Sequence, residues 1–373
     1  MKLFATCARG LEGVLAKEIE LIGAHTIVPG RGGVSFEGDQ ATLYKANLWL
    51  RTAIRVLVTL LEGETTDTDD LYEWVRTIDW SELMTPGHTL AVDCNVRDSY
   101  ITHSQYAARR VKDAICDQFV DRVGIRPSVD KERPMVGLNL HIHRNKAVLS
   151  LDSSGDSLHK RGYRPALTKA PLNESLASGI LYLSGWQPSI PLYDPMCGSG
   201  VFPIEACWMA LNRPPGLTRK HFGLMGWMDF DIQLWTGLRD QARTEMLAEL
   251  PAPIVGSDIR KDVVEFAKVN GKTAGVGNLL KWLVTDVCKS EPPTTEPGII
   301  ICNPPYGERI GDLNEIRELY QWMGDHFRKR FQGWRFVVFT SEDAPWKYLG
   351  PKPEKSTPLW NGKIQCKLLN FSL

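Results

Sequence analysis

The chain has 373 residues, of which 43% are apolar and 24% are charged, and its 44 lysines and arginines balance 44 acidic residues. This composition is typical of a soluble protein of two or three domains, and it excludes a general electrostatic attraction of the whole chain to nucleic acid. The sequence contains no recognisable signal peptide and no apolar run of 18 residues, so we expect neither secretion nor a membrane span, and a cytoplasmic location.

The cysteine pattern does not indicate a metal or a redox motif. None of the eight cysteines forms a Cys-x-x-Cys pair, and several lie in apolar runs, as buried free thiols do. His141 and His143 are close in sequence, but no third ligand follows them at a useful spacing. We therefore expect a solvent-facing histidine pair, no bound metal and a reducing cytoplasm.

The first 62 residues predict a small ferredoxin-like β/α layer. A strand over Lys2–Thr6 precedes a helix, and a glycine turn leads to a second strand at Val34–Phe36. A second helix, Ala41–Trp49, and a strand, Ile54–Leu61, complete the layer. The first helix has apolar residues at the 3.6-residue period of a one-sided helix: Leu11, Val14, Leu15, Ile19 and Ile22.

Residues 63–165 predict a second α+β module, in which a strand at Leu90–Cys94 precedes a basic helix, Tyr106–Phe119. The run Val136–Ile142 alternates apolar and polar residues, which is typical of a half-exposed strand, and Ala147–Leu151 is expected beside it.

The charge of this part of the chain is unevenly distributed. Residues 62–82 contain eight acidic residues and one basic residue, whereas residues 97–169 contain fourteen basic and eight acidic residues. A basic excess confined to one module is typical of an RNA binder, and Arg109 and Arg110 on the basic helix are candidate contacts. Solvated charges scattered over several faces are the alternative interpretation.

A basic bridge, His159–Pro165, leads from this module to a helix predicted over residues 172–184. An ordinary linker is one interpretation of the bridge. The functional interpretation is a strip on which RNA phosphates lie against Lys160, Arg161 and Arg164.

From residue 190 onward, apolar strands alternate with helical patterns, which predicts a mostly parallel, doubly wound α/β sheet. The last apolar run, Ile364–Phe371, has no helix before it and predicts an antiparallel edge strand. Residues 213–239 are rich in prolines and aromatic residues and interrupt the alternation. We expect this insertion to lie over the carboxyl edge of the sheet, where it could touch a substrate.

A glycine-containing turn, Asp194–Gly200, closes the first strand of this sheet and opens a helix. Gly198 and Gly200 allow backbone amides to approach a ligand, and the helix N-terminus beyond them offers unpaired N–H groups. Asp194 can accept hydrogen bonds from an amine or a hydroxyl. Such a turn alone is weak evidence for a ligand site, because Gly-x-Gly also occurs in turns that bind nothing.

A second motif, Asn303–Gly307, follows an apolar strand about 100 residues later. Asp258 and Asp286 end the two strands between the motifs, and ligands of doubly wound sheets bind at such carboxyl ends. Asp258 can accept both hydroxyls of a ribose, and Asp286 can accept an adenine amino group. A single aspartate at a strand end is more often a helix cap, but four polar strand ends in order favour a ligand site.

These motifs resemble those of a known family. Asp194–Gly200, Asp258, Asp286 and Asn303–Tyr306 are similar to the ordered motifs of class I S-adenosylmethionine-dependent methyltransferases. Asn-Pro-Pro-Tyr is the form found in enzymes that methylate exocyclic amino groups. With its N-terminal half, the chain resembles THUMP-domain RNA methyltransferases that make N2-methylguanosine, above all bacterial large-subunit rRNA enzymes and, more distantly, transfer-RNA enzymes. Many of the rRNA relatives carry a second methyltransferase domain, whereas this sequence ends at Leu373.

The resemblance implies a fold, three domains and a cofactor. The fold is a Rossmann-like class I methyltransferase domain, mostly parallel with an antiparallel edge strand, after ferredoxin-like and THUMP α+β modules. The implied domains are residues 1–62 (ferredoxin-like), 63–165 (THUMP, RNA-binding) and 166–373 (methyltransferase). The implied S-adenosylmethionine contacts are Asp194, Pro195, Cys197, Gly198, Gly200, Asp258, Ile259, Asp286, Val287 and Asn303. The expected RNA contacts are Lys160, Arg161, Arg164, Arg109 and Arg110.

The expected chemistry follows from the Asn-Pro-Pro-Tyr residues. A guanine N2 amine is a poor nucleophile, and two acceptors, Asn303 Oδ1 and the Pro304 carbonyl, would localise its lone pair and direct it at the methyl group. Pro305 has no N–H and Pro304 has a fixed φ, so the loop is stiff. Tyr306 offers a face for stacking the target base, which must leave any helix to reach the cofactor. The catalytic residues are thus expected to be Asn303, Pro304 and Tyr306.

Three other functions are compatible with the same residues. A transfer-RNA guanine-N2 methyltransferase shares the architecture, and an adenine-N6 DNA methyltransferase would use Asn-Pro-Pro-Tyr equally well. The third is a non-catalytic RNA-binding protein, although Gly198, Gly200 and Asn303, which an inactive domain usually loses, are all present. The sequence names neither the modified nucleotide nor the oligomeric state.

Overall fold

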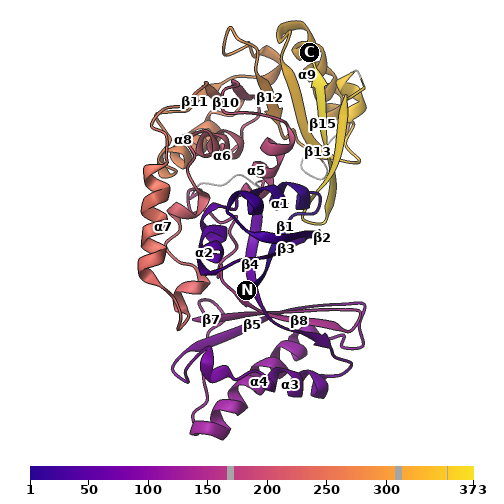
Figure 1. Cartoon of the computed structure of the whole chain (residues 1–373). Coiled ribbons are helices and arrows are strands. Elements are labelled where there is room, and N and C mark those ends of the chain that lie inside the picture. The colour runs from indigo at the N-terminus through magenta and orange to yellow at the C-terminus, as the bar shows by residue number, and fades with distance from the viewer. Residues whose placement is uncertain (166–171, 307–312, 351) are drawn as a thin grey trace.

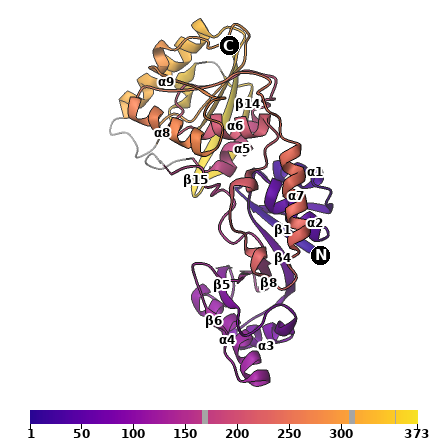
Figure 2. The same cartoon turned by 90° about the vertical axis from the view of Figure 1, so that its left-hand side faces the viewer.

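The computed structural model describes residues 1–165, 172–306, 313–350 and 352–373. These residues form an elongated molecule with an eight-stranded sheet in the N-terminal half and a seven-stranded sheet in the C-terminal half (Figures 1 and 2). Within the described part of the chain, no helix is long and apolar enough to cross a membrane.

The larger sheet contains the strands of both N-terminal modules. Its strands, in order across the sheet, are β2 (His25–Gly30), β3 (Gly33–Glu37), β1 (Lys2–Cys7), β4 (Ala53–Glu64), β8 (Lys146–Asp152), β7 (Val136–His143), β5 (Thr89–Arg97) and β6 (Ser128–Val129). The long strand β4 pairs with β1 on one side and with β8 on the other, so one sheet joins the two modules.

In the first module, α1 (Glu12–Leu21) and α2 (Gln40–Trp49) cover the sheet. The predicted one-sided character of α1 is confirmed, because Leu11, Leu15 and Ile19 are fully buried. β2 was not predicted from the sequence. Most of its residues are exposed, so the strand lacks the apolar alternation that marks a half-buried strand.

In the second module, two helices, α3 (Thr68–Arg76) and α4 (Ser104–Val123), pack on one face of β5, β7 and β8. The predicted basic helix and the alternating strand are both present. α3 lies in the acidic segment and begins at Asp67, whose carboxylate accepts hydrogen bonds from the N–H groups of Asp69 and Asp70 at 2.8 and 2.9 Å.

The smaller sheet is doubly wound, as predicted. Its strands, in order, are β11 (Lys281–Val284), β10 (Ile254–Asp258), β9 (Leu192–Asp194), β12 (Ile299–Cys302), β13 (Arg335–Ser341), β15 (Ile364–Ser372) and β14 (Lys355–Asn361). The helices that accompany it are α5 (Glu174–Leu183), α6 (Val201–Ala210), α7 (Ile232–Thr244), α8 (Lys261–Thr273) and α9 (Leu313–Arg330). Side chains of β12 alternate between a core shared with α5 and α6 and a core shared with α9.

The antiparallel part of this sheet has one more strand than expected. β15 pairs antiparallel with β13, as predicted, but β14 pairs with its other side and forms the outer edge. β14 was missed because Pro358 and a series of exposed residues interrupt its apolar pattern.

The insertion at residues 213–239 was placed wrongly. It follows α6, which starts at the carboxyl edge of the sheet and, running antiparallel to the strands, delivers the chain to the amino side. There, Tyr44 of α2 packs against Phe230 and Trp235 at ring-centroid distances of 5.7 Å. The Arg219 guanidinium donates to four main-chain carbonyls of residues 154–160. The insertion therefore fastens the N-terminal half to the smaller sheet.

Candidate functional site

The predicted motif residues lie in a row along one edge of the smaller sheet. β11, β10, β9 and β12 are adjacent and parallel, so their carboxyl ends meet at the same edge. In register, Asp194 pairs with Gly256, and Tyr193 pairs with Ile300. The glycine turn after β9 and the Asn303 loop after β12 thus leave neighbouring strands, which is the geometry that a transfer reaction between them needs. Gly307, the last motif residue, lies outside the described residues.

The two glycines of the turn after β9 are required for different reasons. Gly198 has a φ of 54°, and a Cβ built on it would meet only open space. Gly200 has a φ of 87°, and its Cβ would lie 2.7 Å from the Trp282 ring. Gly198 serves the backbone conformation alone, whereas Gly200 also allows the start of α6 to approach β11. The contact with Trp282 was not foreseen, because nothing in the sequence links β11 to this turn.

Asp194 is buried at the end of β9. One of its carboxylate oxygens accepts a hydrogen bond from the Met196 N–H at 3.1 Å. Burial raises the pKa of Asp194 well above 3.8, and the nearby charge of Asp258 raises it further. A cationic group bound at this turn would favour the ionised carboxylate.

Asp258 and Asp286 both accept hydrogen bonds from backbone N–H groups. The Asp258 carboxylate accepts from the Gly198 N–H at 3.2 Å, which joins the ends of β9 and β10. Asp286 accepts from the Cys288 N–H at 3.0 Å and so caps the short helix η4 (Val287–Lys289). The cap was the alternative role for a single aspartate, and the structure confirms that Asp286 performs it.

The remaining predicted cofactor contacts differ in exposure. Ile259, next to Asp258, is 64% exposed and presents an apolar side chain at the carboxyl edge. Cys197 and Val287 are buried, and the Cys197 N–H donates to the Ser257 carbonyl at 2.8 Å. The Cys197 carbonyl accepts from the Gly200 N–H at 2.8 Å, so both backbone polar groups of Cys197 serve the turn itself. Pro195 lies in the turn between Asp194 and Cys197 and is buried.

The Asn303 loop contains an acceptor that lacks a partner. Asn303 Oδ1 is buried, and it makes no hydrogen bond to any residue that the structure describes. Leaving a buried acceptor unsatisfied costs about 1–3 kcal/mol, which a ligand donor at this position would recover. Pro304, which follows, is also buried.

Tyr306 does not offer the open stacking face that was predicted. Tyr306 is only 2% exposed, and its hydroxyl accepts a hydrogen bond from Asn361 Nδ2 of β14 at 3.2 Å. The ring belongs to the apolar core between the two halves of the molecule. A stacking role would require the loop to rearrange.

The basic bridge is mostly an internal structure, which corrects the prediction for two of its arginines. Arg161 is 1% exposed, forms an ion pair with Glu205 at 3.7 Å and donates to the carbonyl of Leu158 at 2.6 Å. The Glu205 carboxylate also accepts from Tyr163 at 2.9 Å and Ser178 at 2.7 Å. Arg161 was misassigned because a basic linker sequence does not reveal a buried carboxylate contributed by α6.

Arg164 contacts the glycine turn after β9 instead of solvent. Its buried guanidinium donates to the Leu172 carbonyl at 2.8 Å and to Ser199 Oγ at 2.9 Å, and it pairs with Glu174 at 3.1 Å. Ser199 lies between the two glycines of the turn. Ser199 and Glu174 were both missed, although the position of Ser199 inside the motif was a signal.

The other three predicted RNA contacts are at the surface. Lys160 is exposed and pairs with Asp156 at 3.2 Å. Arg110 pairs with Asp69 at 2.7 Å, whereas Arg109 is exposed on α4. Arg109 is therefore placed to meet an external anion, whereas Lys160 and Arg110 are each partly neutralised by an aspartate.

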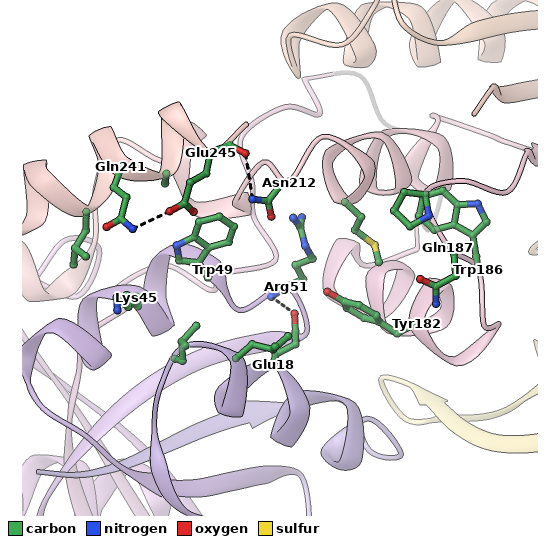
Figure 3. Close-up of a pocket in the computed structure, with 16 residues that line it drawn as sticks. Glu18, Lys45, Trp49, Arg51, Tyr182, Trp186, Gln187, Asn212, Gln241 and Glu245 are labelled. Carbon is green, nitrogen blue, oxygen red and sulfur yellow. Dashed lines mark hydrogen bonds between the residues drawn. The ribbon is translucent and has the colours of Figure 1, made fainter. Parts of the chain in front are cut away.

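A separate cavity of about 530 Å³ lies on the amino side of the smaller sheet, where α1 and α2 meet the last turns of α5 and α6 (Figure 3). The Glu18 carboxylate accepts from the backbone N–H groups of Arg51 and Thr52 at 2.9 and 3.0 Å. Burial raises the pKa of Glu18. The Arg51 guanidinium donates to the Arg213 carbonyl at 2.8 Å, so this seam joins the two halves, and it is distinct from the motif edge.

The described residues contain no group of three or more His, Cys, Asp or Glu side chains that could hold a metal ion. The row of polar strand ends, the glycine turn and the doubly wound sheet define the class I methyltransferase fold.

Comparison with known families supports this class along the chain. Residues 161–370 match the RMKL-like methyltransferase domain, residues 2–57 match the RlmL ferredoxin-like domain, and residues 65–152 match the THUMP domain. The first match covers more than half of the chain. The protein therefore belongs to the RMKL-like methyltransferase family and carries a THUMP module.

Two curated relatives are similar over the whole chain. "Putative RNA methyltransferase slr0064" of Synechocystis is 43% identical over 99% of this chain and 96% of its own length. Ribosomal RNA large subunit methyltransferase K/L of Syntrophotalea carbinolica is 42% identical over 100% of this chain, which spans 54% of that longer protein.

Two solved structures have the same overall fold. SMU.472, described as a methyltransferase complexed with SAH, is 29% identical with a TM-score of 0.91, over 100% of this chain and 97% of that one. A Listeria monocytogenes protein described as a predicted N6-adenine-specific DNA methylase is 31% identical with a TM-score of 0.89, over 99% and 95%.

Proposed function

We propose that this protein transfers a methyl group from S-adenosylmethionine to the exocyclic N2 amine of a guanosine in structured RNA, with 23S ribosomal RNA as the substrate. The observation that carries the proposal is the buried Asn303 Oδ1, which has no hydrogen-bond partner among the described residues and directly follows β12, the strand next to β9 and its glycine turn. An acceptor at that position suits an N–H donor of a base.

The residues at the carboxyl edge suit S-adenosylmethionine. Asp194 and the turn to Gly200 would hold its charged methionine part, Asp258 its ribose hydroxyls, and Asp286 and Ile259 its adenine. The SAH complex of a neighbour with a TM-score of 0.91 supports this assignment. The bound cofactor supplies an activated methyl group on a sulfonium.

The protein's own residues would prepare the amine. Asn303 Oδ1 and the Pro304 carbonyl accept its two hydrogens, so the nitrogen lone pair is directed toward the glycine turn. Catalysis then consists mainly of placing the amine against the methyl carbon in the correct orientation. The transfer requires no covalent enzyme intermediate: the sulfonium would leave as the neutral thioether of S-adenosylhomocysteine, and the methylated amine would lose one proton to solvent.

An RNA substrate is favoured over DNA by the N-terminal half. The THUMP match, the exposed Arg109 on α4 and the RNA methyltransferase names of two relatives at 42–43% identity support RNA. The description of the Listeria protein as a DNA methylase favours adenine N6 of DNA, which is the second candidate.

Labelled S-adenosylmethionine offered with total RNA or with DNA separates these candidates. We expect label in RNA, recovered as N2-methylguanosine after digestion to nucleosides. Label in DNA, or in N6-methyladenosine, would reject the proposed substrate. Mapping the modified position then distinguishes ribosomal from transfer RNA.

The role of Asn303 predicts the behaviour of two variants. We expect Asn303→Ala to lower kcat by about 100-fold or more, because it removes an acceptor aimed at the reacting amine. Asn303→Asp keeps an acceptor oxygen and should retain more activity. Calorimetry with S-adenosylhomocysteine should give unchanged affinity for both variants. Full activity of Asn303→Ala would remove Asn303 from the mechanism.

A further inference from the structure

The loop after β1 touches the hairpin formed by β14 and β15. The Cζ atom of Arg9 lies 4.0 Å from the ring centroid of Trp360, a cation–π contact between the first module and the last strands of the chain. A Cβ on Gly10 would lie 2.6 Å from the Pro358 carbonyl oxygen, and the φ of Gly10 is 91°. This close approach therefore requires glycine next to Arg9.

The loop that carries Arg9 is held in place from its other side. The Glu12 carboxylate accepts hydrogen bonds from the N–H groups of Gly10 at 2.8 Å and Gly32 at 2.9 Å. Leu11 is fully buried in the core between the two halves. The backbone on both sides of Arg9 is thus fixed, and the Trp360 ring restricts the exposed side chain.

This contact lies beside the candidate catalytic loop. Trp360 precedes Asn361, whose Nδ2 donates to the Tyr306 hydroxyl at 3.2 Å. β14 runs parallel to β13, since both are antiparallel to β15, so its last residues lie at the carboxyl edge. Tyr306 is three residues from Asn303, a span of at most about 11 Å.

Two cationic side chains at this place are available to bind an anion. Arg9 and Lys363, in the hairpin turn, are exposed, and neither forms an ion pair with any described residue. The nearby Glu342 is occupied by Lys367 at 3.0 Å. An anion approaching the carboxyl edge would meet two cationic side chains from opposite ends of the sequence.

We propose that Arg9, positioned by Trp360, and Lys363 bind a backbone phosphate of the RNA next to the target nucleotide. This inference rests on the proposed function, since it presumes an RNA substrate at the Asn303 loop. It gives the ferredoxin-like module a direct part in substrate binding at the methyltransferase site. A rigidly held guanidinium suits a phosphate, which accepts two parallel hydrogen bonds from it.

The test compares Arg9→Ala, Arg9→Lys and Trp360→Leu with the full-length wild-type protein on a methyl-accepting RNA. We expect Arg9→Ala to raise the KM for RNA about tenfold and to reduce the salt dependence of RNA binding by about one in the log–log slope. Arg9→Lys should restore the slope but only part of the affinity. S-adenosylhomocysteine affinity should not change in any variant.

Arg243→Ala is the matched control. Arg243 is an exposed arginine on α7, which packs on the amino side of the smaller sheet, and its removal should leave KM and the salt slope unchanged. An unchanged KM and slope in Arg9→Ala would overturn the inference, even if Asn303→Ala is inactive and the proposed function holds. If the wild-type protein methylates no RNA, the proposed function and this inference fall together. Should Trp360→Leu fail to fold, the two Arg9 variants decide the question.

Discussion

Asp194 is a carboxylic acid whose protonation depends on what binds beside it. Burial raises its pKa well above 3.8 in the protein without ligand. A bound ammonium or sulfonium group stabilises the carboxylate and lowers this pKa. At a pH below the raised pKa, the Asp194 carboxyl should therefore release its proton when a cationic group binds at the turn.

This exchange predicts a pH dependence for cofactor binding. Because protons are released, the affinity for S-adenosylmethionine should increase with pH, by up to about tenfold per unit, from 3.8 up to the raised pKa. Calorimetry in buffers of different ionisation enthalpy would measure the released proton. The same raised pKa makes the unliganded fold less stable as pH increases through that range. An affinity that is independent of pH would show that Asp194 is already ionised.

Ser199 connects the cofactor turn to Arg164. We expect Ser199→Ala to weaken cofactor binding about three- to tenfold, because the turn loses the hydrogen bond that fixes it between the two glycines. Ser178→Ala is the control: it deletes a buried hydroxyl that bonds to Glu205 and does not touch the turn. It should lower the thermal midpoint without changing affinity. Equal affinities for the two variants would contradict the role of Ser199.

At the scale of single residues, the sequence predicts the position of those residues that belong to a local motif. Asp194, Gly198, Gly200, Asp258 and Asn303 all lie along one edge, because strand ends and turns are local features. Residues whose role depends on distant partners were misassigned. Arg161 is buried against a carboxylate of α6, and Arg164 against a carboxylate of α5. The local sequence around the two arginines does not predict these ion pairs.

Among the elements, the start of α6 depends on β11. The Trp282 ring fills the space where a side chain at residue 200 would point. The helix can therefore begin close to the sheet only after a glycine. The turn after β9 is thus shaped both by its own backbone and by the neighbouring layer.

Two glycine variants separate these contributions. Gly198→Ala meets open space and should cost only the left-handed backbone strain, about 1–2 kcal/mol of unfolding free energy. Gly200→Ala adds a contact of 2.7 Å with Trp282 and should cost more. Urea unfolding of both variants measures the difference, and Trp282→Leu should recover part of the loss in the Gly200→Ala background. Equal losses would mean that Trp282 moves aside without cost.

Helices and strands with a strong period of apolar residues were predictable from the sequence. Elements whose place depends on contacts with other parts of the chain were not. α1, β7 and the alternating strands and helices of the smaller sheet follow from periodicity. β2 and β14 are exposed strands without that period, and they are defined by the strands they pair with. The position of the 213–239 insertion depends on the direction of α6, which a residue pattern does not contain.

Across the whole molecule, Arg219 fixes the chain that joins the two halves. Its guanidinium donates to the carbonyls of Ser154, Asp156, Ser157 and Lys160 at distances between 2.8 and 3.1 Å. Burial lowers its pKa to about 10, so it remains charged at neutral pH. One side chain thus satisfies four main-chain acceptors of the connecting segment.

Replacing Arg219 should affect RNA methylation and cofactor affinity to different extents. We expect Arg219→Met to lower the unfolding free energy by about 2–4 kcal/mol, because several buried carbonyls lose their donor. RNA methylation should decrease more than cofactor affinity, since the carbonyls that Arg219 holds belong to residues 154–160, whereas the contact with the glycine turn comes from Arg164, further along the segment. Calorimetry and a methylation assay on the same preparation would compare the two, with Arg243→Met as the control. An equal loss of both would indicate general unfolding.

The twelve residues of β4 belong to both modules of the larger sheet, so no flexible joint separates the ferredoxin-like and THUMP strands. One continuous sheet therefore sets the distance from α4 to the loop that carries Arg9. We expect such a molecule to select RNA hairpins by their length. A hairpin shortened or lengthened by a few base pairs would contact one end of the protein and not the other.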